Sequence, residues 1–263
     1  ERVRHVAVRA YTPLPPSGAA VVENRFIGDW LVYGGRHHWP SQPPGQREAV
    51  APPSLMAVPL ARPREAVRLA PTHNAIRIDR IGADAVVTGY GGSEGLSLSY
   101  VSLAAGRPAL AATALLRGRF ESEGRSHAFN AWQRGDGGGL IAFPTRASPD
   151  QSHRYRLDGE SSDVSFVTVS PARALSPAGQ LSARAGRGAS GYRCEVSCID
   201  WYGNSRPIFT GGRTFALLGS ELVEGRMEGG RILELARLDL TGTPATRDRA
   251  GARAAPELIP LEP

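Results

Sequence analysis

The sequence contains one pattern that is typical of a catalytic serine. Gly91-Gly92-Ser93-Glu94-Gly95 matches Gly-x-Ser-x-Gly, in which a strained turn between a strand and a helix exposes the serine beside oxyanion-binding amides. Here the segment after the glycines, Leu96 to Leu103, alternates between apolar and polar residues as a strand does. We therefore interpret 91–95 as a hairpin turn between two strands, and we predict no catalytic residue.

Three other polar residues form a candidate ligand site. Arg125, His127 and Asp200 would bind an anionic ligand if they faced the mouth of a shared channel. The alternative is that His127, which lies in a predicted strand, is hydrogen-bonded inside the core or links two sheets. The sequence leaves both interpretations open.

Cys194 and Cys198 are the only cysteines in the chain. In an extended strand their Cα atoms would lie ~13 Å apart, whereas a disulfide requires a separation below ~7 Å. A bridge therefore needs a turn between them, and the following residues 200–204 have turn chemistry. We expect a disulfide, which would place the protein outside the cytosol. Two free thiols, or a metal or redox pair, are the alternatives, although no histidine lies within forty residues.

Other motifs give no cofactor or metal site. Arg134 to Gly139 contains an Arg-Gly-Asp tripeptide, but an Asp-Gly pair with further glycines is what a β-hairpin turn requires. His37 and His38 are adjacent in a Pro-rich segment that we interpret as a surface loop. No P-loop, dinucleotide-binding fingerprint or zinc-protease helix is present, and we predict no cofactor.

The elements that carry these residues repeat along the chain. Arg25 to Gly34 resembles Arg80 to Gly89, which begins 55 residues later, and a looser copy occupies Arg213 to Gly219. In the first two copies an arginine stands four residues before an aspartate: Arg25 before Asp29, and Arg80 before Asp84. A repeat of roughly 40–50 residues is typical of stacked supersecondary units such as β-propeller blades. We expect Asp29 and Asp84 to be structural residues at equivalent positions, receiving turn amides or pairing with those arginines.

The apolar segments group into four units of short strands. The expected strands, in chain order, are 24–33 as a hairpin, 55–60, 75–81, 85–88, 96–103, 110–120, 126–132, 140–144, 155–157, 164–169, 207–209, 214–218 and 231–240. The last segment has a composition that also suits a helix, but we predict a strand. His5 to Tyr11 is a further short β-like segment that would close a ring by pairing with 231–240.

The composition agrees with an all-β globular domain. The 263 residues are 41% hydrophobic and include 31 Gly and 21 Pro, which favours many turns over long helices. We predict one propeller-like domain over 1–240 and a disordered Pro/Ala/Arg-rich tail over 241–263. No apolar run is long enough to be a transmembrane helix. The first residues, Glu1 to Arg4, include neither an initiator Met nor an apolar signal core, so we expect a processed or partial chain.

The charge does not indicate nucleic-acid binding. The net charge is +6 and every basic residue is an arginine, but the arginines are scattered singly. A nucleic-acid interface requires a basic cluster and a recognisable motif, and the sequence has neither. We therefore predict no nucleic-acid partner.

Several of these motifs resemble bacterial β-propeller-domain proteins of unknown function. The resemblance is carried by the Arg-x-x-x-Asp hairpins, by 125–129 followed by 139–144, and by 215–219, and it covers about residues 20–240. It implies an exported protein in a periplasmic, surface or secreted setting, and it provides no catalytic residues. Such propellers usually have more than four blades, so the resemblance also implies that this chain is the C-terminal part of a larger ring.

The sequence thus predicts an all-β protein, a propeller or partial propeller of about four antiparallel blade-like sheets. The function we expect is a non-enzymatic extracytoplasmic scaffold or protein-binding module. Its partner would be another protein or further N-terminal blades. A propeller-type hydrolase or lyase acting on an extracellular substrate is the alternative.

Overall fold

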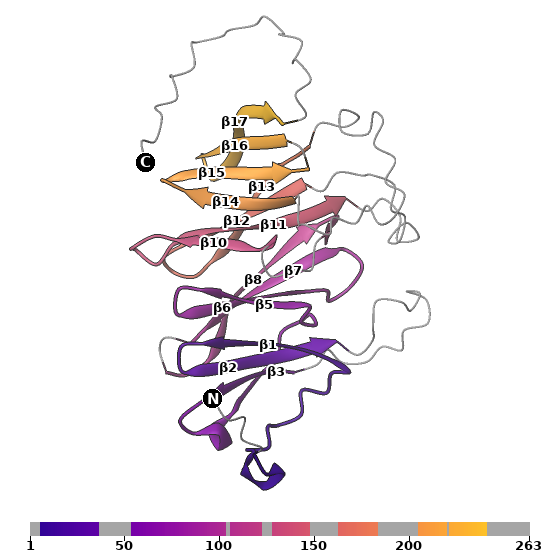
Figure 1. Ribbon diagram of the computed structural model, residues 1–263, viewed down its shortest axis with the longest axis vertical. Coiled ribbons are helices and arrows are strands. Elements are labelled where there is room, and N and C mark those ends of the chain that lie inside the picture. Colours follow the sequence, from indigo (N-terminus) through magenta and orange to yellow (C-terminus); the bar gives the residue numbers. More distant parts are fainter. Residues whose placement is uncertain are drawn as a thin grey trace, which may run out of the picture.

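The structure is a computed structural model, and it describes residues 6–36, 54–103, 106–122, 128–147, 163–183, 205–219 and 221–240. Within these ranges the chain is all-β and forms four antiparallel sheets (Figure 1). Sheet 1 contains β1 (Val21–Ile27), β2 (Trp30–Arg36), β3 (Leu55–Pro59) and β4 (Val67–Leu69). Sheet 2 contains β5 (Arg77–Ile81), β6 (Asp84–Gly89), β7 (Gly95–Ser102) and β8 (Ala109–Arg117). Sheet 3 contains β10 (Asn130–Gln133), β11 (Gly139–Ala147), β12 (Asp163–Val169) and β13 (Leu175–Leu181), and β9 (Arg119–Glu121) also pairs with β11. Sheet 4 contains β14 (Ser205–Thr210), β15 (Arg213–Leu218), β16 (Glu221–Glu228) and β17 (Arg231–Asp239).

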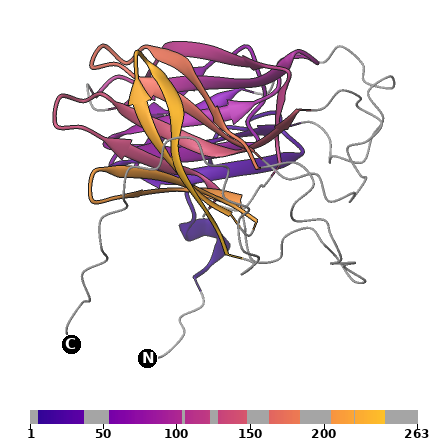
Figure 2. The ribbon, with the colours of Figure 1, turned by 90° about the horizontal axis from the view of Figure 1, so that it is seen from above.

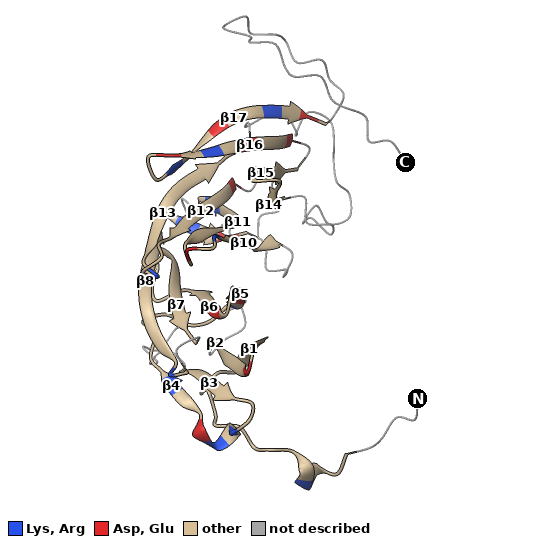
Figure 3. Ribbon diagram, turned by 90° about the vertical axis from the view of Figure 1, so that its left-hand side faces the viewer, with Lys and Arg blue, Asp and Glu red and all other residues tan. Residues whose placement is uncertain are grey.

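The sheets stack face to face along the long axis of the molecule. In each sheet the strands follow one another in chain order, and each pairs with the next. Seen along the stack, the sheets lie one behind another (Figure 2). From the side they form an arc, with β1, β5, β10 and β14 on its concave side and β4, β8, β13 and β17 on its convex side (Figure 3). The four sheets are thus antiparallel meanders, and the arc that they form is open.

The ends of the arc do not meet within the described residues. The prominent contacts between sheets join β1 and β2 to β5, β5 to β10, β8 to β13, β10, β11 and β12 to β14, and β13 to β17. All of these join neighbouring sheets, and sheets 1 and 4 lie at opposite ends (Figure 3). The expectation of four antiparallel sheets is confirmed, whereas a closed propeller is not observed.

Each junction between sheets is a separate apolar core. Because alternate residues of a strand point to opposite faces, one face of each interior sheet packs on the preceding sheet and the other on the next. The core between sheets 1 and 2 includes Ile27, Val32, Leu55, Ile78, Val87 and Val101. The core between sheets 2 and 3 includes Val86, Leu98, Tyr100, Ile141, Phe143 and Val167. The core between sheets 3 and 4 includes Leu140, Phe166, Ala178, Leu181, Ala216 and Val223.

The two repeated hairpins occupy equivalent positions in sheets 1 and 2, but Asp29 and Asp84 do not occupy equivalent positions within them. β1 and β2 are joined by Gly28-Asp29, and β5 and β6 by Gly82-Ala83. Both glycines have positive φ, 53° and 58°, as tight two-residue hairpin turns require. Asp29 is therefore an exposed turn residue, while Asp84 is the buried first residue of β6. The prediction that Asp29 and Asp84 are equivalent is wrong by one residue.

The N-terminal segment differs from its prediction. Val8–Ala10 is a short 3-10 helix, and the described part of 5–11 pairs with no strand, so it does not join β17 to close a ring. A second 3-10 helix, Pro63–Glu65, precedes β4. Neither described helix has the length or apolar composition that crossing a membrane needs. The prediction of a strand over 231–240 is confirmed by β17.

Candidate protein-binding surfaces at the ends of the sheet array

Most of the residues predicted to carry chemistry lie outside the described part of the chain. These are Arg125, His127 and Asp200 of the candidate ligand site, and Cys194 and Cys198 of the candidate disulfide. The loop with His37 and His38, the predicted strand 155–157 and the predicted tail 241–263 also lie outside it.

Both glycine-rich motifs lie in turns between strands, as predicted. The segment 91–94 joins β6 to β7, so Ser93 is not at the start of a helix. In the turn between β10 and β11, the Asp136 carboxylate accepts hydrogen bonds from the backbone N–H of Gly138 at 2.8 Å and from Nε of Arg134 at 3.2 Å. These two donors, first Gly138 and then Arg134, hold the pKa of Asp136 below its ordinary value. This carboxylate stabilises its own turn.

A buried ionic network joins sheets 1, 2 and 3. On β5, Arg77 donates from Nε to Glu121 of β9 at 2.7 Å. Asp79 accepts a hydrogen bond from Arg25 of β1 at 2.8 Å, and its second oxygen lies 3.7 Å from Arg77. Burial raises the pKa values of Asp79 and Glu121, while the facing arginines lower them. Arg25 thus pairs with Asp79 of the next sheet rather than with Asp29.

A second network, on Asp84, joins sheets 2 and 3. Its carboxylate accepts hydrogen bonds from the Tyr100 hydroxyl at 2.9 Å and from the backbone N–H of Leu103 at 2.6 Å. Arg173, in the turn between β12 and β13, donates from Nε at 3.1 Å. Burial, together with the Asp84 carboxylate, raises the pKa of Tyr100 to about 12. Asp84 is therefore a structural residue, as predicted, although its arginine partner is Arg173 rather than Arg80.

These carboxylates are paired between packed sheets and are structural. Arg237 of β17 extends the pattern to sheet 4, because it donates to the Ser182 carbonyl after β13 at 2.8 Å as well as to Glu221 at 2.7 Å. Within the described ranges, no three His, Cys, Asp or Glu residues are grouped as metal ligands are. The ionic groups of this part of the chain hold the stack together.

The outward face of sheet 4 is an exposed apolar surface of the described stack. We define it as the face of β14–β17 turned away from sheet 3. Alternation places on this face Ile208, Phe215, Leu217, Leu222, Leu233 and Leu238, opposite the residues that pack on sheet 3. Leu217, Leu222 and Leu238 pair across three adjacent strands, and Leu238 is 56% exposed. This face has the residue types of a sheet junction without a described sheet against it.

Two of the arginines on this outward face are paired with carboxylates of the same face. Arg213 forms two hydrogen bonds with the carboxylate of Glu224, at 2.8 and 2.7 Å. The same guanidinium lies over the Phe215 ring, 4.8 Å from its centroid. Arg226 likewise pairs with Glu228 at 3.0 Å. Two further arginines of this face, Arg206 and Arg231, are exposed and form no ion pair with a described residue.

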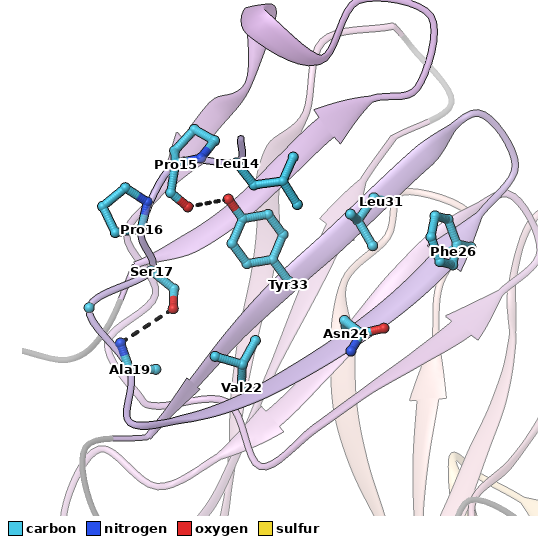
Figure 4. Close-up of a pocket in the computed structure, with 11 residues that line it drawn as sticks. Leu14, Pro15, Pro16, Ser17, Ala19, Val22, Asn24, Phe26, Leu31 and Tyr33 are labelled. Atoms are coloured by element: carbon cyan, nitrogen blue, oxygen red, sulfur yellow. Dashed lines mark hydrogen bonds between the residues drawn. The ribbon is translucent and has the colours of Figure 1, made fainter. Parts of the chain in front are cut away.

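The outward face of sheet 1 contains an apolar groove. We define this face as the side of β1–β4 turned away from sheet 2. The groove has a volume of about 510 Å³ and is lined by Leu14, Pro15, Pro16, Ser17, Gly18, Ala19, Val22, Asn24, Phe26, Leu31 and Tyr33 (Figure 4). The segment before β1 forms one wall, held by a hydrogen bond from the Tyr33 hydroxyl to the Pro15 carbonyl. Phe26 is 63% exposed on the strand side.

Met56 and Val58 extend the apolar surface beneath this groove. They form a small cluster with Tyr33, and Leu31 packs against it, separate from the core shared with sheet 2. Sheet 1 thus has an apolar layer on both faces. The alternation of Val22, Asn24 and Phe26 is a sequence signal for this surface, but alternation alone cannot show that one face of a sheet lacks a neighbour.

The amino-acid sequence matches no protein-family model and no curated protein. The geometry of the described residues is therefore the basis for any functional conclusion.

Proposed function

We propose that this chain is a non-enzymatic scaffold, part of a β-propeller, that binds another protein through the open ends of its sheet array. The observation that carries the proposal is the outward face of sheet 4. Its apolar residues repeat the composition of the three internal junctions, yet no described segment covers them. Exposed apolar patches of this kind are typical of interaction surfaces.

The free energy available on such a face favours binding. Complete burial of a leucine or phenylalanine side chain stabilises by about 1.5–3 kcal/mol relative to full exposure. Leu233 and Leu238 are about half exposed, and Phe215, Leu217 and Leu222 are partly buried. A partner that covered all five would gain several kcal/mol, on the order of what a specific interface uses after the cost of association.

An enzyme has less support from the described residues. Asp79 and Glu121 are the carboxyl pair that would suit acid–base chemistry, because burial raises both pKa values. Each is held by an arginine between packed sheets, so neither is free to approach a substrate. A hydrolase or lyase activity would therefore need groups from outside the described ranges.

We place this scaffold outside the cytosol, in the periplasm, on the cell surface or secreted. The support is the isolated pair Cys194 and Cys198 and the resemblance to exported propeller proteins. Intact mass under non-reducing conditions, with and without an alkylating reagent, tests it on protein from its native compartment. A disulfide prevents alkylation, whereas two added alkyl groups would remove the covalent support for an oxidising compartment.

A photo-cross-linking amino acid at position 222 tests the binding proposal. The protein would be expressed in its native host, and Leu222 would be compared with Arg117, whose side chain is 74% exposed on β8 of sheet 2, away from the outward face of sheet 4. We expect one discrete cross-linked protein at 222, identified by mass spectrometry, and none at 117. If irradiation gives no discrete adduct at 222, the proposed function is wrong.

A further inference from the structure

We infer that the partner is a second copy of this chain, bound head to tail. The outward face of sheet 4 of each copy packs on the outward face of sheet 1 of the other, and the two arcs close into one ring of eight sheets. This inference rests on the proposed function and specifies its partner. Its support comes from the repetition of the junctions, the shape of the two faces, and the geometry of closure.

The proposed contact continues a series of junctions that the chain already contains. At each internal junction, the face of one sheet that points forward along the chain packs on the backward face of the next sheet. Only two such faces lack a described neighbour, the forward face of sheet 4 and the backward face of sheet 1. They are the two halves of one further junction of the same type, and a second copy can join them while the arc of each copy stays open.

The two faces are complementary in form. The sheet 4 face carries leucines that protrude from its strands, with Leu233 48% and Leu238 56% exposed. The sheet 1 face offers a groove of about 510 Å³ whose floor and walls are mostly apolar. The leucines are the convex component and the groove beside Phe26 is the concave component, so side chains can interdigitate as they do in a protein interior.

Two of the arginines at the proposed contact are already paired, and the groove itself carries no charge. Arg213 and Arg226 are already paired with Glu224 and Glu228 on sheet 4. The groove lining has one amide side chain, Asn24, and no ionisable acid or base other than the Tyr33 phenol. Three exposed arginines form no ion pair with a described residue: Arg206 and Arg231 on the sheet 4 face and Arg68 on the sheet 1 face. Arg206 and Arg68 are on edge strands and Arg231 is beside a turn, so these charges can stay in water at the rim of the contact rather than be buried without a partner.

Closure of the ring favours two copies. A head-to-tail contact repeated about a two-fold axis closes on itself and leaves neither end face exposed. Four sheets from each copy give eight, which is within the range of four to eight blades seen in propellers. A dimer that paired the two sheet 4 faces with each other would leave the groove of each sheet 1 open.

The segment before β1 takes part in the contact. Leu14 to Ala19 forms a wall of the groove rather than its contents, because Val22 and Phe26 remain exposed beside it. The partner's leucines would therefore lie between this segment and the strands of sheet 1.

Light scattering after size-exclusion chromatography tests the inference on the full chain. The wild type should be a discrete dimer. Leu238→Arg on sheet 4 and Phe26→Arg on sheet 1 each place a charge in the junction, and each variant alone should be a monomer. Trp132→Arg is the matched control, because this side chain is 46% exposed on β10 of sheet 3, away from both end faces, and this variant should remain a dimer. Circular dichroism should show the same strand content in all four proteins.

Mixing the two monomeric variants separates a head-to-tail contact from a symmetric one. The Phe26→Arg variant retains an intact sheet 4 face, and the Leu238→Arg variant retains an intact sheet 1 face. An equimolar mixture at high concentration should therefore form a one-to-one pair through a single junction. If the Phe26→Arg variant remains a dimer alone, the contact is symmetric through sheet 4 and the inference is overturned.

The failure of this inference can be distinguished from the failure of the proposed function. A wild type that is monomeric at all concentrations overturns the two-copy ring. If the cross-link at position 222 then joins a different protein, the binding function stands with another partner. If position 222 gives no discrete adduct, both the ring and the binding function are overturned.

Discussion

At the scale of single residues, four arginines form specific hydrogen bonds between neighbouring sheets. Arg25, Arg77, Arg173 and Arg237 each reach from one sheet to a carboxylate or carbonyl on its neighbour. Apolar cores can pack in several registers, whereas a buried guanidinium must meet an acceptor at a fixed point. We therefore interpret these arginines as residues that fix how one sheet sits on the next.

Breaking one of these buried pairs should be costly. Arg77→Met leaves Glu121 buried without its cation, and we expect the free energy of unfolding to fall by about 3–5 kcal/mol in urea titrations. The control is Arg117→Met, whose pair with Glu94 is between side chains 74% and 64% exposed. That change should cost about 0–1 kcal/mol. Equal losses in the two variants would show that the Arg77 pair is not a buried support.

His73 should make the stability of the protein depend on pH. Its ring is fully buried, with Nε2 2.8 Å from the Ser99 hydroxyl and Nδ1 2.7 Å from the Asn74 carbonyl oxygen. Burial lowers the pKa of His73, so the unfolded chain binds a proton more readily than the folded chain. The contribution to stability is therefore complete above the ordinary pKa of 6.5 and is lost as the pH falls below it.

The measurement is chemical unfolding at about pH 7.5 and about pH 5.5. We expect the wild type to lose on the order of 1 kcal/mol between these values through His73, a loss that the His73→Gln variant lacks. A pH dependence that is unchanged in the variant would contradict this assignment.

The partners of these residues were not predictable from the sequence. Arg25 was expected to pair with Asp29 four residues later, but its partner is Asp79 in the next sheet. His73 was not singled out at all, because a lone histidine before a strand has no distinguishing pattern. Such contacts depend on which strands become neighbours, and that is decided by the stacking of sheets rather than by local spacing.

At the scale of elements, glycines set the register of the hairpins. Gly82 follows Gly28 by 54 residues, whereas the matching aspartates are 55 apart, and the structure follows the glycines. A turn with positive φ tolerates few residues besides glycine, so the turn position is a stronger constraint than a shared acidic residue. Aligning the turn glycines would have given the correct register.

Two of the strands missed from the sequence, β13 and β16, share a physical cause. β13 contains Pro177 and Gly179, and β16 contains Gly225, residues that weaken the strand pattern. β13 pairs with β12 on one side only, and Gly225 lies beside an irregularity in the pairing of β16 with β17. Edges and bulges tolerate such residues, so the sequence signal is lost where the structure is still a strand.

Gly89, the last residue of β6, packs closely against the segment before β5. A Cβ at this position would lie 1.7 Å from the Asn74 carbonyl oxygen, so Gly89→Ala must displace the backbone before β5. We expect a loss of about 1–3 kcal/mol in the free energy of unfolding. The control is Gly92→Ala, where a Cβ has no neighbour within 4 Å and stability should change little. If both variants lose the same free energy of unfolding, Gly89 does not pack against the segment before β5 in this way.

At the scale of the whole molecule, the stack behaves as a one-dimensional array. The main contacts among the described residues join each sheet to its neighbours, so an interior sheet is supported on two faces and an end sheet on one. In such arrays stability is approximately the sum of the sheets and their junctions, and the ends open most easily. The four sheets could be predicted from periodicity. The open arc could not, because curvature depends on how each sheet sits on the next.

Hydrogen exchange should reveal both the array and its closure. In the Leu238→Arg variant, amides of β6, β7, β11 and β12 should exchange slowest, because both faces of their sheets are covered, and amides of β15 and β16 should exchange faster. In the wild type, the junctions between two copies should protect amides of β15 and β16 in sheet 4 and of β1 and β2 in sheet 1 from exchange. This protection should grow with protein concentration. The interior strands should change less, since their faces are already packed in either state. Equal protection of all sheets in the variant would contradict the one-dimensional description. Protection of sheet 4 alone in the wild type would show that sheet 1 does not take part in closure.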